Sequence, residues 1–240
     1  MSVQTSSDIV ILDEIEACPY LSDKTARMPL RMPVIQISPQ EVDVRLAQGH
    51  RRTGEFLYQT RCPDCKACEP IRIDCEEFEI RRSQRRVLRR GDREIEVKLG
   101  PVMADSRRVD LFNKHRQTRG LAKIDSSIDI EEYIWGFVRS CFNSFEISYW
   151  IDGQLAGAAI CDQGQDSLSA VYTFYDPDFG RYCIGTFSIL KQIEYCLTQG
   201  LKYLYLGYYI GPSPHMKYKE RFRPNERRIN GEWIKFNSET

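Results

Sequence analysis

The pattern of apolar and polar residues changes near Phe145, where period-two alternation replaces the helical spacing of the preceding segments. Residues 145–151 (FEISYWI) and 154–161 (QLAGAAIC) read as strands joined by Asp152-Gly153, a favoured two-residue hairpin turn. Residues 167–174 predict a third strand. Residues 186–199 then predict a helix that ends at Gly200, and the aromatic run 202–207 predicts a further strand. This order predicts an antiparallel meander, a crossover helix and one more strand of the same sheet.

The first half of the chain predicts shorter elements. A serine cap, a proline at the first helical position and an early acid at residues 38–41 predict a helix that ends at Gly49. Residues 49–75 predict two short strands around a cysteine-bearing turn, because aromatic and aliphatic runs alternate there with glycine and proline. Residues 105–119 and 129–142 predict helices that begin at capping aspartates.

An arginine-rich helix is expected at residues 81–93, and we expect Gly91 to fray or end it. Seven of these thirteen residues are arginine, whereas the whole chain carries 34 basic and 34 acidic residues. One helical face would carry Arg82, Arg85, Arg86, Arg89 and Arg93. This face either pairs with the chain's own acids or contacts the phosphates of a nucleic acid. The second interpretation is favoured, since the planar arginine fork matches phosphate.

Nine cysteines are present, and those of the first third are clustered. The N-terminus has no secretory pattern and no apolar run spans a bilayer, so a cytoplasmic protein without disulfides is expected. Cys62, Cys65 and Cys68 form a compact triple, to which Cys18 would add a fourth thiolate. Four thiolates suit a zinc or iron–sulfur site. The alternative is a set of structural or regulatory thiols without metal.

The last third of the chain combines a glycine-bearing helix start with aromatic and charged residues. Residues 180–186 open the helix, and the backbone N–H groups at such a start, near Gly185, favour an anion. The aromatics of residues 172–177 and 205–209 are either core or the walls of a pocket with Asp176 and the cations of residues 215–223. Asp176 is the candidate base. His215 is a second candidate, unless it is merely exposed.

Several stretches together carry a family resemblance. They are CPYLSDKTARMPLR (18–31), GHRRTGEFLYQTRCPDCKACEPIRI (49–73), RRSQRRVLRR (81–90), SAVYTFYDP (169–177), GTFSILKQIEY (185–195), YLYLGYYI (203–210) and MKYKERFRP (216–224). With them the chain resembles the arginyl-/leucyl-tRNA–protein transferases, and most closely the bacterial aspartate/glutamate leucyltransferases.

The resemblance implies an α+β protein of two domains. A smaller N-terminal domain with the cysteine motifs and the arginine helix would cover residues 1–95, and a GNAT-like (N-acetyltransferase-like) mixed-sheet domain would cover residues 96–240. It implies transfer of leucine from leucyl-tRNA to the α-amine of proteins that begin with Asp or Glu, which marks them for degradation in the N-degron pathway. The aminoacyl ester is already activated, so no cofactor is needed for the transfer.

The candidate residues can be assigned to the steps of this aminoacyl transfer. Asp176, with Tyr172 and Tyr175, would take the proton of the acceptor amine. The tRNA would contact the arginine face and Gly185. Substrate binding is assigned to Tyr205, Tyr208, Lys217, Lys219 and Arg221, with one or more of these cations holding the acidic side chain.

Three other functions remain open on the sequence. Arginine from arginyl-tRNA is a possible donor in place of leucine. A coenzyme-A-dependent acetyltransferase has the same expected fold but leaves the arginine helix unexplained. A non-catalytic, cysteine-rich nucleic-acid-binding module would make the aromatic stretches pure core.

Overall fold

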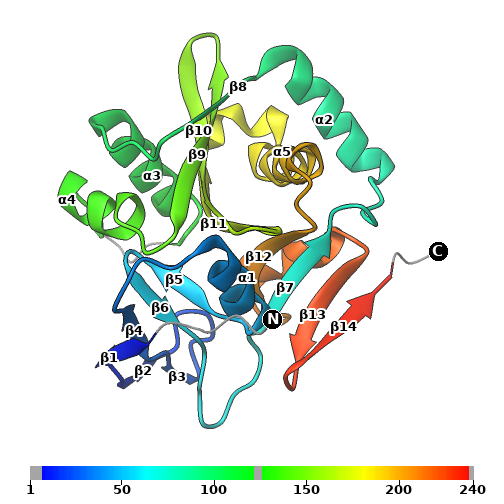
Figure 1. Cartoon of the computed structure of the whole chain (residues 1–240). Coiled ribbons are helices and arrows are strands. Elements are labelled where there is room, and N and C mark those ends of the chain that lie inside the picture. Colours follow the sequence, from blue (N-terminus) through cyan, green and yellow to red (C-terminus); the bar gives the residue numbers. More distant parts are fainter. Residues whose placement is uncertain (1–6, 122–125, 238–240) are drawn as a thin grey trace.

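The computed structural model describes residues 7–121 and 126–237, which form an α+β fold around one large mixed sheet (Figure 1). Eight strands lie in the order β14-β13-β7-β12-β11-β10-β9-β8. Their bounds are β7 (Glu69–Asp74), β8 (Glu96–Gly100), β9 (Asn143–Ile151), β10 (Gln154–Gln163), β11 (Ser167–Tyr175), β12 (Tyr203–Tyr209), β13 (Asn225–Ile229) and β14 (Glu232–Phe236).

The predicted meander, crossover helix and returning strand are confirmed at the centre of this sheet. Strands β9, β10 and β11 are antiparallel neighbours, and α5 (Ile184–Gln199) then leads to β12, which lies parallel to β11. Asp152 and Gly153 make the β9–β10 turn with φ of 48° and 75°, as a primed turn requires. The expected α+β fold with a large mixed sheet is therefore confirmed.

A smaller sheet and a short hairpin come from the start of the chain. The small sheet has the order β1-β4-β6-β5, and β2 pairs with β3. Bounds are β1 (Asp8–Leu12), β2 (Ile15–Ala17), β3 (Thr25–Arg27), β4 (Leu30–Pro33), β5 (Arg51–Thr53) and β6 (Phe56–Tyr58). Strand β7 leaves this region and pairs antiparallel with β12. The large sheet therefore contains one strand from before residue 95, and the domain boundary there stays a prediction.

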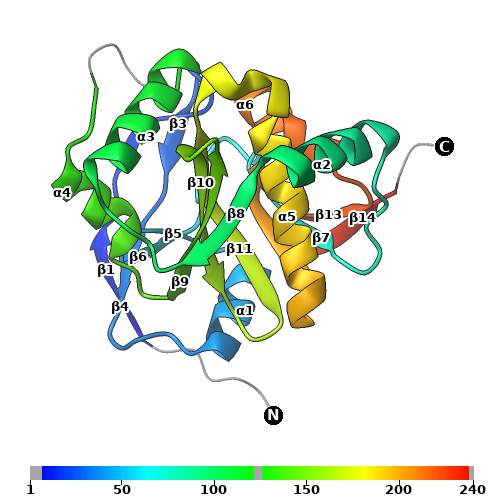
Figure 2. The ribbon, with the colours of Figure 1, turned by 90° about the horizontal axis from the view of Figure 1, so that it is seen from above.

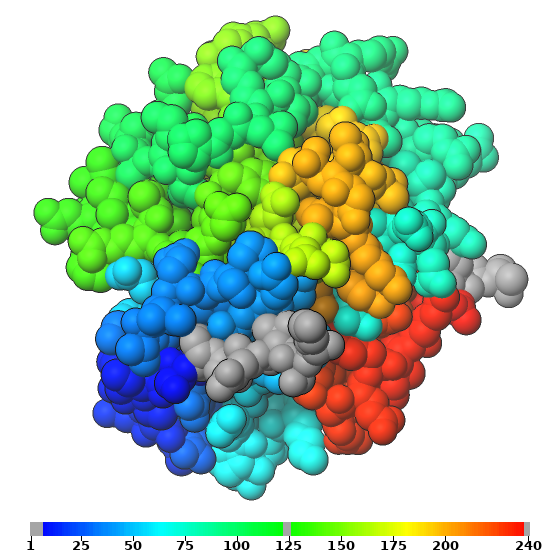
Figure 3. Space-filling model, viewed as in Figure 1, coloured from blue at the N-terminus to red at the C-terminus, as the bar shows by residue number. Residues whose placement is uncertain are grey.

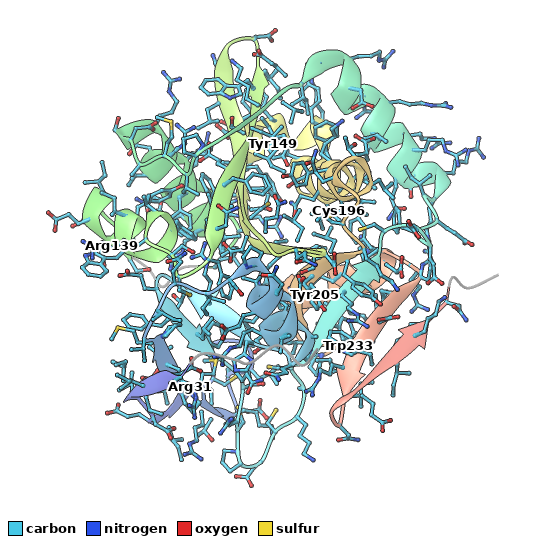
Figure 4. All side chains as sticks on the ribbon, in the orientation of Figure 1. Arg31, Arg139, Tyr149, Cys196, Tyr205 and Trp233 are labelled. Carbon is cyan, nitrogen blue, oxygen red and sulfur yellow. The ribbon has the colours of Figure 1, made fainter. Side chains whose placement is uncertain are left out.

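Helices cover both faces of the large sheet (Figures 1 and 2). On one face α2 (Arg82–Glu94) packs beside α5 over the main core, which includes Tyr149 and Cys196 (Figure 4). On the other lie α1 (Pro39–Ala47), α3 (Ser106–Thr118) and α4 (Ile130–Tyr133). Residues Ile134–Val138 continue α4 as a π-helical turn, so the helix predicted to reach residue 142 is shorter. None of the helices in residues 7–121 and 126–237 is long and apolar enough to cross a membrane.

A buried ion pair fixes the small sheet against the large one. The Arg52 guanidinium of β5 donates to both carboxylate oxygens of Asp162 in β10, at 2.7 and 2.8 Å. Both side chains are 1% exposed. Removing either partner would leave an uncompensated buried charge, which is strongly destabilising. The orientation of β5 relative to the large sheet is thus tightly determined.

The prediction that Gly91 ends the arginine helix is wrong. Helix α2 continues to Glu94, and Gly91 is buried against the ring of Phe187 in α5. A Cβ at Gly91 would lie 2.2 Å from the nearest ring carbon. The glycine is needed for the close approach of the two helices, not for a helix end.

Replacing Gly91 with alanine should therefore destabilise the protein despite the better helix propensity of alanine. The added methyl group must displace Phe187, so we expect a loss of about 1–3 kcal/mol in the free energy of unfolding. Urea denaturation measures it. Gly100→Ala, where nothing lies within 4 Å of the new Cβ, is the matched control. Equal stability of the wild type and Gly91→Ala would contradict this packing.

Candidate functional site

The candidate site lies where β11 and β12 diverge. The two strands pair in parallel at only three positions, from Ser167 opposite Tyr203 to Ser169 opposite Tyr205. We call the unpaired remainder, residues 170–175 of β11 and 206–209 of β12, the strand divergence. β11 still pairs with β10 here and β12 with β7, but the backbone groups that face the gap between β11 and β12 lack a ladder partner and must find other partners.

Arg51 of β5 supplies one such partner. Its Nη1 donates to Ser169 Oγ at 2.9 Å, and its Nη2 donates to the Ala170 carbonyl at 2.8 Å. Gly207 of β12 faces the same guanidinium with φ of +85°, and a Cβ there would lie 3.3 Å from Nη2. Arg51 therefore lies between the two strands at the point where they separate.

Lys219 is a buried cation beside Arg51. It belongs to the 3₁₀ turn Tyr218–Arg221, is 6% exposed, and its Nζ donates to the Tyr208 carbonyl at 2.7 Å. Burial, and secondly the charge of Arg51, lower the pKa of Lys219 to about 7. Within residues 7–121 and 126–237, neither cation forms an ion pair with a carboxylate.

Three tyrosines surround these cations. The rings of Tyr58 and Tyr208 meet edge to face at 6.3 Å, and the Tyr208 hydroxyl donates to the Gly49 carbonyl at 3.3 Å. Tyr20 lies close to Tyr58, Cys68 and Arg51. Burial raises the pKa of all three hydroxyls, which therefore stay neutral at physiological pH.

The predicted catalytic tyrosines come together at the far end of β11. The Tyr172 ring packs 5.4 Å from Phe112, and the Tyr175 ring lies against Gly185 at the start of α5, 3.1 Å from where a Cβ would stand. Arg119, which directly follows α3, donates to the Tyr175 hydroxyl. Tyr218, which is 40% exposed, is close to both tyrosines. This end of the strand divergence is thus aromatic and adjoins the helix start.

Asp176 has structural partners of its own. Its carboxylate accepts from the Asp178 backbone N–H at 2.9 Å, which caps the 3₁₀ turn Pro177–Tyr182. It also forms an ion pair with Lys114 of α3 at 2.7 Å, and its side chain is 19% exposed. Asp176 directly follows Tyr175 in the chain. Its role as a base stays a prediction.

Other predicted substrate contacts lie away from Lys219. The Tyr205 ring points to the α1 face and packs against Trp233 at 5.8 Å, with its hydroxyl accepting from Arg72 at 3.0 Å (Figure 4). His215, Lys217 and Arg221 are all exposed. Of the predicted substrate residues, the structure therefore brings only Tyr208 and Lys219 together.

The arginine face of α2 is exposed and largely free of partners. Arg82, Arg85, Arg86 and Arg89 are all exposed, and the sole bond among them within the described residues runs from Arg85 to the Ile80 carbonyl at 3.5 Å. The acids at the end of α2 pair elsewhere, Asp92 with Lys191 and Glu94 with Arg181. The chain's own acids thus leave these four arginines available.

Residues 59–68, between β6 and β7, form a segment with three cysteines, which we call the cysteine segment. It protrudes between the N-terminal strands and the β13–β14 hairpin (Figure 3). Cys18, Cys62, Cys65 and Cys68 are partly exposed free thiols. Burial, and then the other three cysteines, raise the pKa of Cys68 to about 12. In the part of the chain that the structure describes, no three His, Cys, Asp or Glu side chains are arranged to hold a metal ion. The predicted zinc or iron–sulfur site stays a prediction.

Two neighbouring clefts open beside this segment. One of about 440 Å³ is lined by Cys62, Cys65, Cys68 and Tyr208. The next, of about 460 Å³, is lined by several basic residues. These are Arg31, Arg45, Arg61 and Arg228.

Sequence reasoning missed four residues of the site. Arg51 and Tyr58 lie within the stretch 49–73, Tyr20 lies within 18–31, and Tyr218 lies among the C-terminal cations. All four belong to stretches that carry the family resemblance. The resemblance was the available signal for these residues. No neighbouring residue in the sequence indicates that they lie beside β11 and β12.

Comparison with protein families agrees with this architecture. The chain matches the family model described as "Arginine-tRNA-protein transferase, N terminus" over residues 16–86 and the corresponding C-terminus model over residues 107–229. The chain belongs to this family of aminoacyl-tRNA–protein transferases. It is thus an enzyme, an acyltransferase that uses aminoacyl-tRNA.

Curated relatives extend the match to nearly the whole chain. A protein of Acinetobacter baumannii named aspartate/glutamate leucyltransferase is 34% identical over 92% of this chain and 81% of its own. Its namesakes in Chromobacterium violaceum and Methylobacillus flagellatus are each 33% identical, over 90% and 93% of this chain and 89% and 90% of their own.

Solved structures give only distant likenesses. L-PGS from Bacillus licheniformis has a TM-score of 0.45 and 13% identity, covering 61% of this chain and 48% of its own. A tandem GNAT protein from the clavulanic acid biosynthesis pathway has a TM-score of 0.40 and 12% identity, covering 87% and 57%. At these scores the likenesses carry no argument about this chain.

Proposed function

We propose that this protein transfers leucine from leucyl-tRNA to the α-amine of proteins that begin with Asp or Glu. The observation that carries the proposal is the strand divergence, which has Arg51 and Lys219 near one end, and tyrosines with the start of α5 near the other. The relatives named aspartate/glutamate leucyltransferase support the choice of donor and acceptor. The product would carry an N-terminal leucine, which marks it for degradation in the cytoplasm through the N-degron pathway.

The aminoacyl ester is already activated, so the enzyme mainly has to orient the ester and the acceptor amine. The acceptor nitrogen attacks the ester carbonyl carbon of leucyl-tRNA, a peptide bond forms, and the bond from that carbon to the ribose oxygen breaks. The amine loses a proton and the departing ribose oxygen gains one. Because an α-amine has a pKa near 8, part of it is already neutral at physiological pH. Holding ester and amine together supplies much of the rate enhancement.

The residues at the end of β11 are placed for the proton and for the charge on oxygen. Asp176 would receive the proton of the amine, relayed through Tyr172, Tyr175 or water. The hydroxyl of a neutral tyrosine, or an N–H group at the start of α5 near Gly185, would stabilise the oxyanion of the tetrahedral intermediate. No step requires a metal or an organic cofactor.

The tRNA would lie across α2. Arg82, Arg85, Arg86 and Arg89 are exposed, and α2 packs beside α5, whose first turn adjoins Tyr175 (Figure 2). A tRNA whose phosphate backbone is bound along α2 would therefore have its aminoacyl end near the strand divergence. Arginine side chains suit this role because they contact phosphates bidentately.

The transfer assay tests the function directly. Purified protein is incubated with labelled leucyl-tRNA or arginyl-tRNA and with peptides that begin with Asp, Glu or Ala. We expect leucine on the Asp and Glu peptides and none on the Ala peptide. Failure with both donors would refute the proposal. Acetylation of the same peptides by acetyl-CoA would favour a coenzyme-A-dependent acetyltransferase instead.

Charge reversal on α2 tests the tRNA site. Arg85→Glu with Arg86→Glu should weaken tRNA binding and lower the slope of log affinity against log salt by about 1 for each lost phosphate contact. Fluorescence anisotropy at several salt concentrations measures both. Arg139→Glu, at an exposed arginine near α4 (Figure 4), is the control. An unchanged slope in the α2 variant would place the tRNA elsewhere.

Metal analysis tests whether the four thiols rearrange around an ion. We infer that Cys18, Cys62, Cys65 and Cys68 would do so, because four nearby thiols suit zinc or an iron–sulfur cluster. Protein purified without oxygen should then contain stoichiometric zinc or iron. Cys65→Ser should lose it, and Cys183→Ser, at an exposed cysteine outside the segment, should keep it. If the wild-type protein contains no metal, we conclude that the four cysteines are structural or regulatory thiols.

A further inference from the structure

We infer that Arg51 and Lys219 together bind the side-chain carboxylate of the acceptor's first residue. The inference rests on the proposed function, since it names the part of the site that would select Asp and Glu. It narrows the sequence-based candidates for this role to one buried lysine and adds an arginine that lies 168 positions before it in the chain.

Arg51 and Lys219 place two positive charges close together. Lys219 is 6% exposed, and Arg51 is close enough for the two positive charges to repel. Burying a cation without a counter-ion is unfavourable, and buried charges are normally paired. Within the described residues, the partners of both side chains are neutral. Arg51 bonds to the Ser169 and Tyr58 hydroxyls and to a carbonyl, and Lys219 bonds to a carbonyl and a thioether. The cluster therefore favours an anionic ligand.

The orientation of the two side chains suits a carboxylate. Arg51 is fixed by its two bonds to β11, so its guanidinium plane is held in one orientation, and a planar fork matches a carboxylate. Lys219 supplies further donors on a side chain already held by the Tyr208 carbonyl. Tyr20, Tyr58 and Cys68 nearby are partly exposed, so the cluster is open to solvent on their side.

The position along β11 fits the chemistry. Arg51 binds at Ser169 and Ala170, and Tyr172 follows about 7 Å further along the strand. The α-amine of an acidic residue is separated from its side-chain carboxylate by only two or three carbon atoms. An acceptor held by its carboxylate at Arg51 would thus present its amine towards Tyr172 and Tyr175.

The same arrangement explains discrimination against amides. Asn and Gln have nearly the shape of Asp and Glu but bring no charge, so the two cations would remain uncompensated. A site built to bind a polar group rejects an analogue that leaves its own buried groups unpaired. The exposed Lys217 and Arg221 would hold a carboxylate in water, where ion pairs are weak.

The principal test compares acceptors that differ only in charge. For Lys219→Met and Arg51→Met, kcat/KM is measured with peptides beginning with Glu and Gln, and KM is measured for leucyl-tRNA. We expect kcat/KM for the Glu peptide to fall about 10- to 100-fold, as for the loss of a charge-assisted hydrogen bond. The Gln peptide and the KM for leucyl-tRNA should change little. Lys202→Met, at an exposed lysine before β12, is the matched control.

A binding measurement makes the result independent of turnover. The dipeptide Glu-Ala, but not Gln-Ala, should raise the melting temperature of the wild-type protein, and it should have no such effect on Lys219→Met. Lys219→Arg, which keeps the charge, should retain the preference for Glu. Lys219→Met should fold with an equal or higher melting temperature, because it removes an uncompensated buried charge.

Two outcomes would overturn the inference while leaving the proposed function intact. One is a wild-type preference for Glu over Gln that persists in both methionine variants. The other is loss of that preference in Lys217→Met or Arg221→Met, which would place the carboxylate on the surface. Absence of any transfer to Glu peptides by the wild type would instead refute the proposed function.

Discussion

The divergence of β11 from β12 is the constraint on which the whole site depends. Two parallel strands that pair at three positions and then separate leave backbone groups without ladder partners in the middle of a sheet. Arg51 satisfies one of them, and Gly207 leaves room for its guanidinium. The tyrosines, Lys219 and the first turn of α5 are then arranged around the opening that this separation makes. A fully paired sheet would have no place for an ester and an amine to meet.

The N-terminal strands complete this opening and hold it in place. Successive residues of a strand point to opposite faces, so Arg51 and Arg52 have different tasks. Arg52 points to Asp162 and forms the buried ion pair that fixes β5 against β10, whereas Arg51 points to β11. One dipeptide therefore joins the two sheets and lines the candidate site. Mobility of β5 would displace Arg51, and with it the charge that we assign to substrate selection.

Local signals predicted the elements well, because their causes are local. The Asp152-Gly153 turn, the Ser38 cap and the Gly200 helix end each depend on neighbouring residues and appear as expected. Gly91 was misjudged since its reason is Phe187, 96 positions later. The same limit applies to the site. The run MKYKERFRP gives no sign that Lys219 is buried while Lys217 and Arg221 are exposed, and Arg51 meets Ser169 across 118 positions.

A structure of the protein with two small ligands tests this arrangement of the site directly. These are a leucyl-adenosine analogue with an amide in place of the reactive ester, and the dipeptide Glu-Ala. We expect the leucyl carbonyl and the dipeptide amine to lie within the strand divergence, near Tyr172 and Tyr175. The glutamate carboxylate should lie at Arg51 and Lys219. Both ligands bound instead in the basic cleft at Arg31 and Arg228, away from β11, would contradict it.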